Sequence, residues 1–161
     1  MTTSDKGIAL IKRLEGCSTV AYRDVAGFLT IGVGHLLAKS ESASGKILID
    51  GKYVRWADGL TPKQCEDLLR ADLVPAESAV NRLVRPDIHL EQHQYDALVS
   101  FAFNVGESAF RDSTLLKRLN ASQHDQVPAQ LMRWVHAGGK EVTGLKNRRV
   151  FECKMFKGEL T

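Results

Sequence analysis

The chain has 161 residues, of which 43% are hydrophobic and 25% are charged, so it can bury one globular core and is too apolar to be disordered. The net charge of +3 arises in residues 81–161, where twelve basic side chains outnumber nine acidic ones. That excess suits an anionic polymer, but it is small for a nucleic-acid-binding domain, and no such motif is present. No apolar run approaches the roughly 20 residues that span a bilayer, and residues 1–7 lack the features of a signal peptide. A cytoplasmic protein without membrane insertion is expected.

Three cysteines and five histidines could supply a disulfide framework or a metal site. Cys17, Cys65 and Cys153 are odd in number and far apart, so free thiols in a reducing cytosol are expected. His89 and His93 have the spacing of a zinc-protease helix but lack the glutamate that follows the first histidine there. Solvent-exposed histidines are therefore predicted, with no metal site and no cofactor.

Residues 4–15 are predicted to form a short amphipathic helix that Ser4 caps and Gly16 ends. Its apolar positions recur at a helical interval: Ile8, Ile11 and Leu14. Aromatic and β-branched residues in 20–24 and 28–34 flank a turn that contains glycine, a pattern typical of a β-hairpin.

Residues 40–59 are the least informative segment, and Gly45, Asp50-Gly51 and Asp58-Gly59 suggest another short strand pair or loops. A helix follows over residues 61–80, with Thr61 as its cap and Pro62 in its first turn. Pro75 should kink or end this helix. If the helix continues past Pro75, it joins an N-terminal lobe to a C-terminal one.

From about residue 91 the pattern is helical throughout, with interruptions at Gly106 and at Gly138-Gly139. Further helices are expected over 114–119, 127–136 and 145–156, and Trp134 is expected in the core. The predicted class is α+β, predominantly α. One domain is expected, with an N-terminal lobe of residues 15–60, a connecting helix of residues 61–80, and an all-helical C-terminal lobe of residues 81–161 that includes the helix 4–15.

Glu15 lies on the last turn of the first predicted helix, where the helix dipole opposes ionisation of a carboxyl group. A carboxylic acid kept protonated is what a general acid needs. Asp24 ends the first strand of the hairpin and Thr30 lies on the second, so two carboxyl groups and a water-binding hydroxyl could flank a glycosidic bond. On the residues alone, the alternative of a surface acid and a turn aspartate stays open.

A series of motifs resembles glycoside hydrolase family 24, the phage-type lysozymes, and most of all its T-even phage members. The first are Glu15-Gly16, Ala21-Tyr22-Arg23-Asp24 and Gly27-x-x-Thr30-Ile31-Gly32-x-Gly34-His35, which continues to Ser40. Others follow in family order within residues 59–61, 97–106, 113–116, 134–139 and 144–152. Since the motifs span nearly the whole chain, the resemblance implies a lysozyme-like two-lobe fold.

The resemblance implies an endolysin that hydrolyses the β-1,4 bond between N-acetylmuramic acid and N-acetylglucosamine in peptidoglycan, for host-cell lysis. Glu15 is then the proton donor, and Asp24 with Thr30 positions the attacking water. That arrangement is associated with inversion, which requires carboxyl groups about 6.5–9.5 Å apart. A threonine at position 30 favours a water-binding role over a covalent one.

Several other residues have both a functional and a structural interpretation. His35 could be a catalytic base, but the resemblance favours a structural ion pair with Asp72, which would raise the pKa of His35. Leu36, Phe103 and Asn104 match substrate-contacting positions, and ordinary packing is the alternative for each. Arg148 could approach Glu15 or the substrate, yet a solvated arginine is expected.

Two other functions are weighed against the enzyme. A peptidoglycan-binding module of lysozyme fold would be expected to lack Glu15, Asp24 or Thr30, and all three are present. A nucleic-acid-binding domain would show strong, salt-dependent binding to random DNA. The expected endolysin is a monomer that binds glycan strands and no nucleic acid. It accumulates in the host cytoplasm and reaches periplasmic peptidoglycan after a separate holin permeabilises the membrane.

Overall fold

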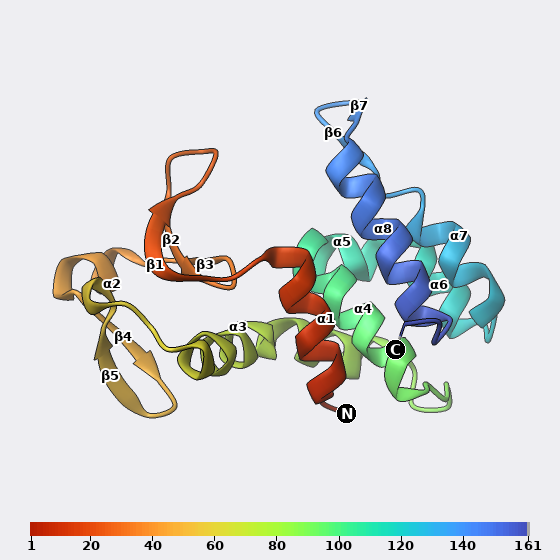
Figure 1. Cartoon of the computed structure of the whole chain (residues 1–161). Helices are drawn as coiled ribbons and strands as arrows, with labels where there is room; N and C mark the ends of the chain where they lie inside the picture. The colour runs from red at the N-terminus through yellow and green to blue at the C-terminus, as the bar shows by residue number, and fades with distance from the viewer. Residues whose placement is uncertain (161) are drawn as a thin grey trace. The chain divides into compact units, whose positions relative to one another are not determined.

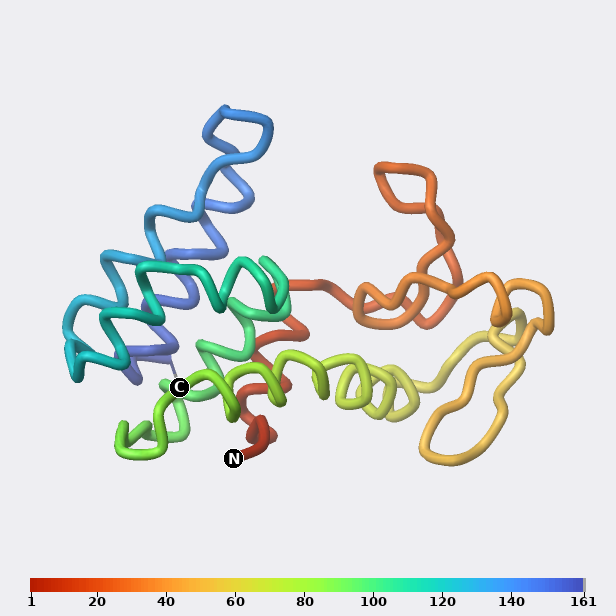
Figure 2. Tube along the Cα trace, turned by 180° about the vertical axis from the view of Figure 1, so that it is seen from behind, coloured from red at the N-terminus to blue at the C-terminus, as the bar shows by residue number. Residues whose placement is uncertain are grey.

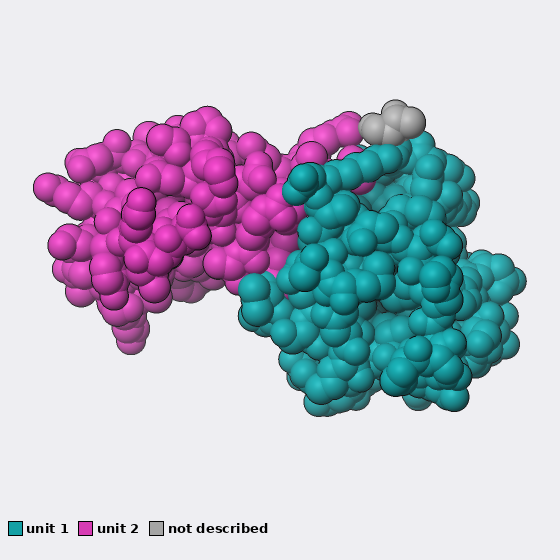
Figure 3. Space-filling view, turned by 90° about the horizontal axis from the view of Figure 1, so that it is seen from below, with its two compact units in different colours: residues 1–7, 74–161 teal, residues 8–73 magenta. Residues whose placement is uncertain are grey.

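The computed structural model describes residues 1–160, and helices predominate in it over three small antiparallel sheets (Figure 1). The α+β class predicted from the sequence is confirmed. The chain forms two compact units, coloured separately in Figure 3. One consists of Ile8–Leu73, and the other combines Met1–Gly7 with the chain from Val74 onward. The expected lobes differ from these units, because the boundary falls within the first helix and again within the long helix of residues 62–83.

Helix α1 (Asp5–Glu15) begins and ends where its sequence predicts. The Ser4 hydroxyl accepts a hydrogen bond from the Gly7 amide at 3.0 Å, which satisfies one free N–H of the first turn. Gly16 has a φ of +74° and donates its N–H to the Lys12 carbonyl at 2.9 Å, so it ends the helix in the left-handed region. These two ends fix the position of Glu15 at the last residue of the helix.

The predicted hairpin is part of a three-stranded antiparallel sheet, of order β1 (Ser18–Arg23), β2 (Leu29–Gly32) and β3 (His35–Leu36). Tyr22 pairs with Thr30 across β1 and β2, and Thr30 pairs with Leu36 across β2 and β3. Strand β3 was not expected as a separate element. It forms because Gly32 and Gly34 have φ values of +67° and +73°, which reverse the chain within two residues.

Residues 39–58 contain a helix that the sequence analysis missed and the strand pair that it suggested. Helix α2 (Lys39–Ser44) precedes β4 (Lys46–Ile49), β5 (Lys52–Arg55) and the 3-10 turn η1 (Trp56–Asp58). The turn between β4 and β5 is at Asp50-Gly51, as the composition indicated, and Figure 2 traces the pair as a rounded loop. Helix α2 is short and buries none of its residues, so it has no apolar periodicity to reveal it.

Helix α3 (Pro62–Leu83) starts with the predicted cap and contains Pro75 within its length. The Thr61 hydroxyl accepts from the Gln64 amide at 3.1 Å, and the Gln64 side chain accepts from the Thr61 amide at 2.9 Å, forming a capping box. The helix continues past Pro75 for two more turns. Both Ala71 and Pro75 are exposed, so water can bond to the carbonyl that the missing N–H leaves unpaired.

The remaining chain is helical apart from one small hairpin, which corrects the expectation of an all-helical C-terminal lobe. Its elements are α4 (Gln92–Val105), α5 (Glu107–Asp112), α6 (Thr114–Asn120), the 3-10 turn η2 (His124–Gln126), α7 (Val127–Leu131), β6 (His136–Ala137), β7 (Lys140–Glu141) and α8 (Thr143–Phe156). The predicted break at Gly138-Gly139 is the turn between β6 and β7, since both glycines have positive φ. Helix α7 ends at Leu131, five residues earlier than predicted.

Each unit has its own set of buried apolar side chains. In residues 8–73 they come from α1, β2, β4 and α3, among them Ile11, Ile31, Ile47, Leu69 and Leu73. In the other unit, α4 packs against α8 and supplies buried side chains that include Tyr95, Leu98, Val99 and Phe101. Within residues 1–160, none of the helices combines the length and the apolar character needed to cross a bilayer.

Candidate active site

Glu15 is half-buried at the end of α1. A Cβ atom added at Gly34 would lie 3.5 Å from Glu15 Oε2, so the carboxyl group lies close to the backbone between β2 and β3. Both residues belong to the unit formed by Ile8–Leu73. The helix end therefore brings a carboxyl group to the sheet that contains Thr30.

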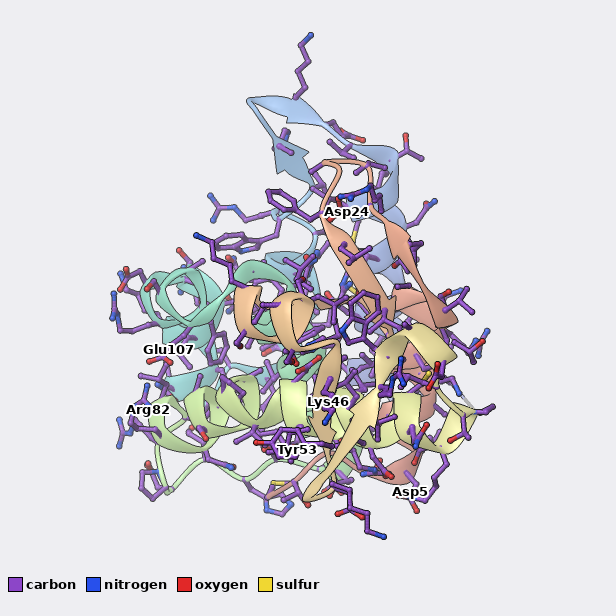
Figure 4. The ribbon with its side chains drawn as sticks, turned by 90° about the vertical axis from the view of Figure 1, so that its left-hand side faces the viewer. Asp5, Asp24, Lys46, Tyr53, Arg82 and Glu107 are labelled. Carbon is purple, nitrogen blue, oxygen red and sulfur yellow. The ribbon has the colours of Figure 1, made fainter. Side chains whose placement is uncertain are left out.

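Asp24 lies at the end of the β1–β2 hairpin, where it is labelled in Figure 4. Its Oδ1 atom accepts hydrogen bonds from the amides of Ala26 at 2.9 Å and Phe28 at 2.8 Å. These two bonds form an Asx-type turn that holds the carboxylate in one orientation. Within residues 1–160, no protein group donates a hydrogen bond to Oδ2. One oxygen of Asp24 thus anchors the side chain, and the other is available to a water molecule.

Thr30 is 2% exposed and lies on the central strand β2, between Tyr22 of β1 and Leu36 of β3. Its hydroxyl donates to the Phe28 carbonyl at 3.1 Å. Asp24 continues the ladder opposite Phe28, with a backbone hydrogen bond of 2.9 Å from Asp24 N to Phe28 O. Because side chains alternate along each strand, Asp24, Thr30 and the exposed Leu36 belong to one face of the sheet.

His35 lies between two carboxylates. Its Nδ1 atom is 2.8 Å from Asp72 Oδ2, and its Nε2 atom is 3.0 Å from Glu41 Oε1. The hydrogen bond to Asp72 is the main cause that raises the pKa of His35 from 6.5 to about 9; burial opposes this rise, and Glu41 adds to it. At neutral pH His35 is therefore an imidazolium ion that links β3 to α2 and α3, a structural position rather than that of a free base.

Glu41 is the residue of this cluster that sequence reasoning did not identify. Its side chain accepts from the Ala38 amide at 2.8 Å, which caps α2, and its carbonyl accepts from the Trp56 indole at 2.9 Å. The sequence signal was weak, because Ala38 has no side-chain oxygen and residues 38–41 therefore lack half of a capping box.

Phe103 and Asn104, the other two expected substrate contacts, lie near the end of α4 in the second unit. Phe103 is half-buried and Asn104 is exposed. The Asn104 side-chain oxygen accepts a hydrogen bond from the guanidinium of Arg149. These two residues and the three of the sheet face are therefore in different units of the chain.

A buried ionic cluster joins α8 to α4 and corrects the expectation of a solvated Arg148. The carboxylate of Glu152 accepts from Arg149 Nη1 at 2.6 Å, Arg148 Nε at 3.0 Å and the Ser100 hydroxyl at 2.7 Å. Arg148 is 8% exposed, whereas Arg149 and Glu152 are fully buried. Burial raises the pKa of Glu152, and the two guanidinium charges oppose that rise. The sequence did not indicate that Arg148 is buried, because the contact between α8 and α4 that buries it forms only in the folded chain.

The aromatic and histidine predictions have mixed outcomes. Trp134 is half-buried and makes an edge-to-face contact with Phe101 at 5.4 Å between ring centroids, so it covers the core rather than filling it. His89 is exposed as expected, but His93 is half-buried, and its Nδ1 atom lies 2.9 Å from the Phe156 carbonyl. Over the described part of the chain, no three His, Cys, Asp or Glu side chains are grouped to hold a metal ion.

A mostly helical α+β chain with a glutamate at a helix end and an anchored aspartate on a neighbouring hairpin has the make-up of a lysozyme-type glycoside hydrolase. The phage lysozyme family matches residues 12–152. The chain therefore belongs to the phage lysozyme family, and it is an endolysin of a class that degrades peptidoglycan.

Three relatives illustrate the match. The endolysin of Salmonella phage P22 is 39% identical over 97% of this chain and 98% of its own length, and a solved P22 lysozyme variant has a TM-score of 0.80 at 37% identity, covering 98% of this chain and 99% of that one. The endolysin of Escherichia coli O157:H7 phage FAHEc1 has a TM-score of 0.81 at 35% identity, covering 99% of this chain and 96% of its own. The endolysin of Bacillus phage PZA is 39% identical over 97% of this chain, which spans 55% of that longer protein. These similarities confirm the lysozyme-like fold.

Proposed function

We propose that this chain hydrolyses the β-1,4 bond between N-acetylmuramic acid and N-acetylglucosamine in peptidoglycan, with inversion at the anomeric carbon. The supporting observation is the environment of the Asp24 carboxylate. Its Oδ1 atom accepts hydrogen bonds from two backbone amides, whereas its Oδ2 atom is accessible to a water molecule. A carboxylate fixed in this way can orient a water molecule and accept its proton.

In the proposed reaction, Glu15 donates its carboxyl proton to the glycosidic oxygen as the bond to the anomeric carbon breaks. A water held by Asp24 and the Thr30 hydroxyl attacks that carbon from the opposite side, and its proton passes to Asp24. The new reducing end then has the α configuration. Threonine supports this route, because a hydroxyl binds water but does not form the glycosyl-enzyme of a retaining carboxylate.

The other proposed contacts follow the positions of the expected substrate residues. Leu36 is 54% exposed beside Thr30, which suits contact with a sugar ring. Asn104 and Phe103, near the end of α4, are the proposed polar and apolar contacts to the substrate. A monomer acting on glycan strands, and dependence on a separate holin for access to the periplasm, complete the proposal for host-cell lysis.

The deciding experiment compares the native chain with Glu15→Gln on outer-membrane-stripped Gram-negative cell walls. The substitution keeps the size of the side chain but removes the transferable proton, so we expect turbidity clearance to fall by at least about a hundredfold. Asp125→Asn, at an exposed position on η2, is the matched control and should clear walls normally.

The products separate the alternatives. New reducing ends in the digest identify glycan cleavage, and an α anomer in the first minutes, seen by proton NMR, identifies inversion. If native and Glu15→Gln proteins clear walls equally, Glu15 is not the acid. If neither clears walls but both sediment with them, the chain is a binding module of lysozyme fold.

A further inference from the structure

The fold brings together two cysteines that are far apart in the sequence. Cys17 is exposed and follows the glycine that ends α1, whereas Cys65 is fully buried in the first turns of α3. The segment after Cys17 runs beside the start of α3, because the Leu60 amide donates to the Thr19 carbonyl at 2.7 Å and Cys65 Sγ lies 4.0 Å from the Ser18 carbonyl. The Cys17 side chain is near enough to Cys65 to add to the rise that burial causes in the pKa of the Cys65 thiol.

We propose that Cys17 and Cys65 are a disulfide-forming pair that cross-links the end of α1 to the start of α3, while Cys153 stays a free thiol. The spacing of three isolated cysteines predicted only free thiols. The pairing is a property of the fold, since the 18–19 segment is held against residues 60–65 by backbone and side-chain contacts within one compact unit.

Cys17 is exposed to solvent and Cys65 is buried, and this difference determines which thiol reacts first with an oxidant. Burial raises the pKa of Cys65 to about 11, the contact with Cys17 adds to this rise, and the charge of Lys12 opposes it. A disulfide oxidant therefore meets Cys17 first. The Cys17 sulfur forms a mixed disulfide and releases one thiol. Cys65 then loses its proton and attacks the Cys17 sulfur, which releases the second thiol and completes the protein disulfide. The protein dithiol is oxidised, and the reagent disulfide is reduced to two thiols.

Cys153 is the internal control for this inference. It is buried on α8 in the other unit, and its Sγ atom lies 3.3 Å from the Pro128 carbonyl. No contact places another cysteine beside it within residues 1–160. An oxidant that acted on cysteines without regard to the fold would modify Cys153 as well as Cys17.

The cross-link would close the chain from residue 17 to residue 65, a segment that contains Asp24, Thr30 and His35. It would fix the residue two positions after Glu15 against α3. In the cell this consequence rests on the proposed function, because a lytic enzyme made among reducing thiols would meet disulfide oxidants only on reaching the periplasm. The bond would then form where the glycan lies and would stabilise the unit that contains Glu15.

The test oxidises the reduced full-length protein with glutathione disulfide and examines it by mass spectrometry without reducing agent. We expect the loss of two hydrogens, a peptide pair joined through Cys17 and Cys65, and a thermal midpoint raised by about 5–10 °C. Cys153→Ala should behave like the native chain. Cys17→Ser, which changes an exposed side chain, should lose both the bond and the thermal shift, and Cys65→Ala should do the same.

A stable glutathione adduct on Cys17 with Cys65 still reduced would overturn the proposal, as would a bond to Cys153 or an unchanged thermal midpoint. Wall clearance is measured in parallel. A protein that forms the bond but clears no walls contradicts the proposed function alone. A protein that clears walls but forms no bond contradicts the thiol pair alone.

Discussion

At the scale of single residues, the two carboxylate oxygens of Asp24 have different roles. The two backbone amides that donate to its Oδ1 atom are fixed by the hairpin turn. The carboxylate is therefore already oriented before a substrate binds, and no side-chain entropy is lost at that step. The sequence indicated a turn aspartate and an active-site carboxylate as alternatives. The structure shows the turn, and the proposed chemistry uses the other oxygen of the same side chain.

We expect Asp24→Asn to separate these two roles. The amide oxygen can still accept from Ala26 and Phe28, so the hairpin and the thermal midpoint should be kept. The side chain can no longer accept a proton from water, and wall clearance should fall by about a hundredfold or more. Turbidity assays and thermal melts of the two proteins check this, with Asp125→Asn as control. Full activity in Asp24→Asn would remove Asp24 from the mechanism.

His35 makes the stability of the fold depend on pH. Since folding raises the pKa of His35 from 6.5 to about 9, its contribution is complete below pH 6.5 and is lost as the pH rises through 9. Partial exposure of the cluster reduces the contribution to about 2 kcal/mol. Urea unfolding between pH 6 and about 9.5 should show this loss in the native chain and not in His35→Gln. If the free energy of unfolding depended on pH in the same way in both proteins, His35 would not be the group responsible.

At the scale of elements, the presence or absence of a regular apolar pattern decided which helices and strands the sequence could predict. Helix α1, the β1–β2 hairpin and the start of α3 each combine a capping or turn residue with a regular apolar pattern, and each was predicted to within a few residues. Helix α2 and strands β3, β6 and β7 lack such a pattern because they are two to six residues long and mostly exposed. Of the outcomes left open at Pro75, the structure shows that the helix does not end there, since solvent can satisfy the carbonyl that the proline leaves unpaired.

The proline nevertheless weakens α3, and Pro75→Ala should stabilise the protein. The alanine restores the hydrogen bond to the Ala71 carbonyl, and the greater freedom of the unfolded chain offsets part of that gain. We expect the free energy of unfolding to rise by about 1–2 kcal/mol. Chemical denaturation measures this change, and Ser78→Ala, at an exposed position of the same helix, should change it by only a few tenths. A destabilised Pro75→Ala protein would show that the proline is needed at this position.

At the scale of the whole molecule, the first four residues belong to the unit built mainly from the C-terminal half. The Ser4 amide and hydroxyl donate to Asp96 at 3.1 and 2.5 Å, the Tyr95 hydroxyl donates to the Met1 carbonyl at 2.9 Å, and Thr3 bonds to Glu77. The side-chain amide of Gln92 also donates to Asp96 at 2.9 Å. The start of the chain is thus bonded to α3 and α4, which lie more than seventy positions away in the sequence.

Asp96→Ala tests this attachment. It leaves the Ser4 amide, the Ser4 hydroxyl and the Gln92 amide without their acceptor, so we expect a loss of about 2–4 kcal/mol in the free energy of unfolding. Hydrogen exchange should accelerate over residues 92–105 more than over residues 46–55. Asp87→Ala, which removes an exposed partner of Arg85, is the control and should change little. Uniform acceleration in both segments would contradict a local attachment.

The amino-acid sequence by itself determined the helices with clear periodicity, the hairpin, the fold class and the family, because caps, turns and motifs are local or ordered along the chain. It also identified the candidates Glu15, Asp24 and Thr30. Only the tertiary structure decided that Glu41 joins Asp72 at His35, that Arg148 is buried against Glu152, and that Cys17 meets Cys65. Each of these pairings depends on where separate elements come to lie. Charge and burial in the folded chain, which no local pattern encodes, then give those residues their properties.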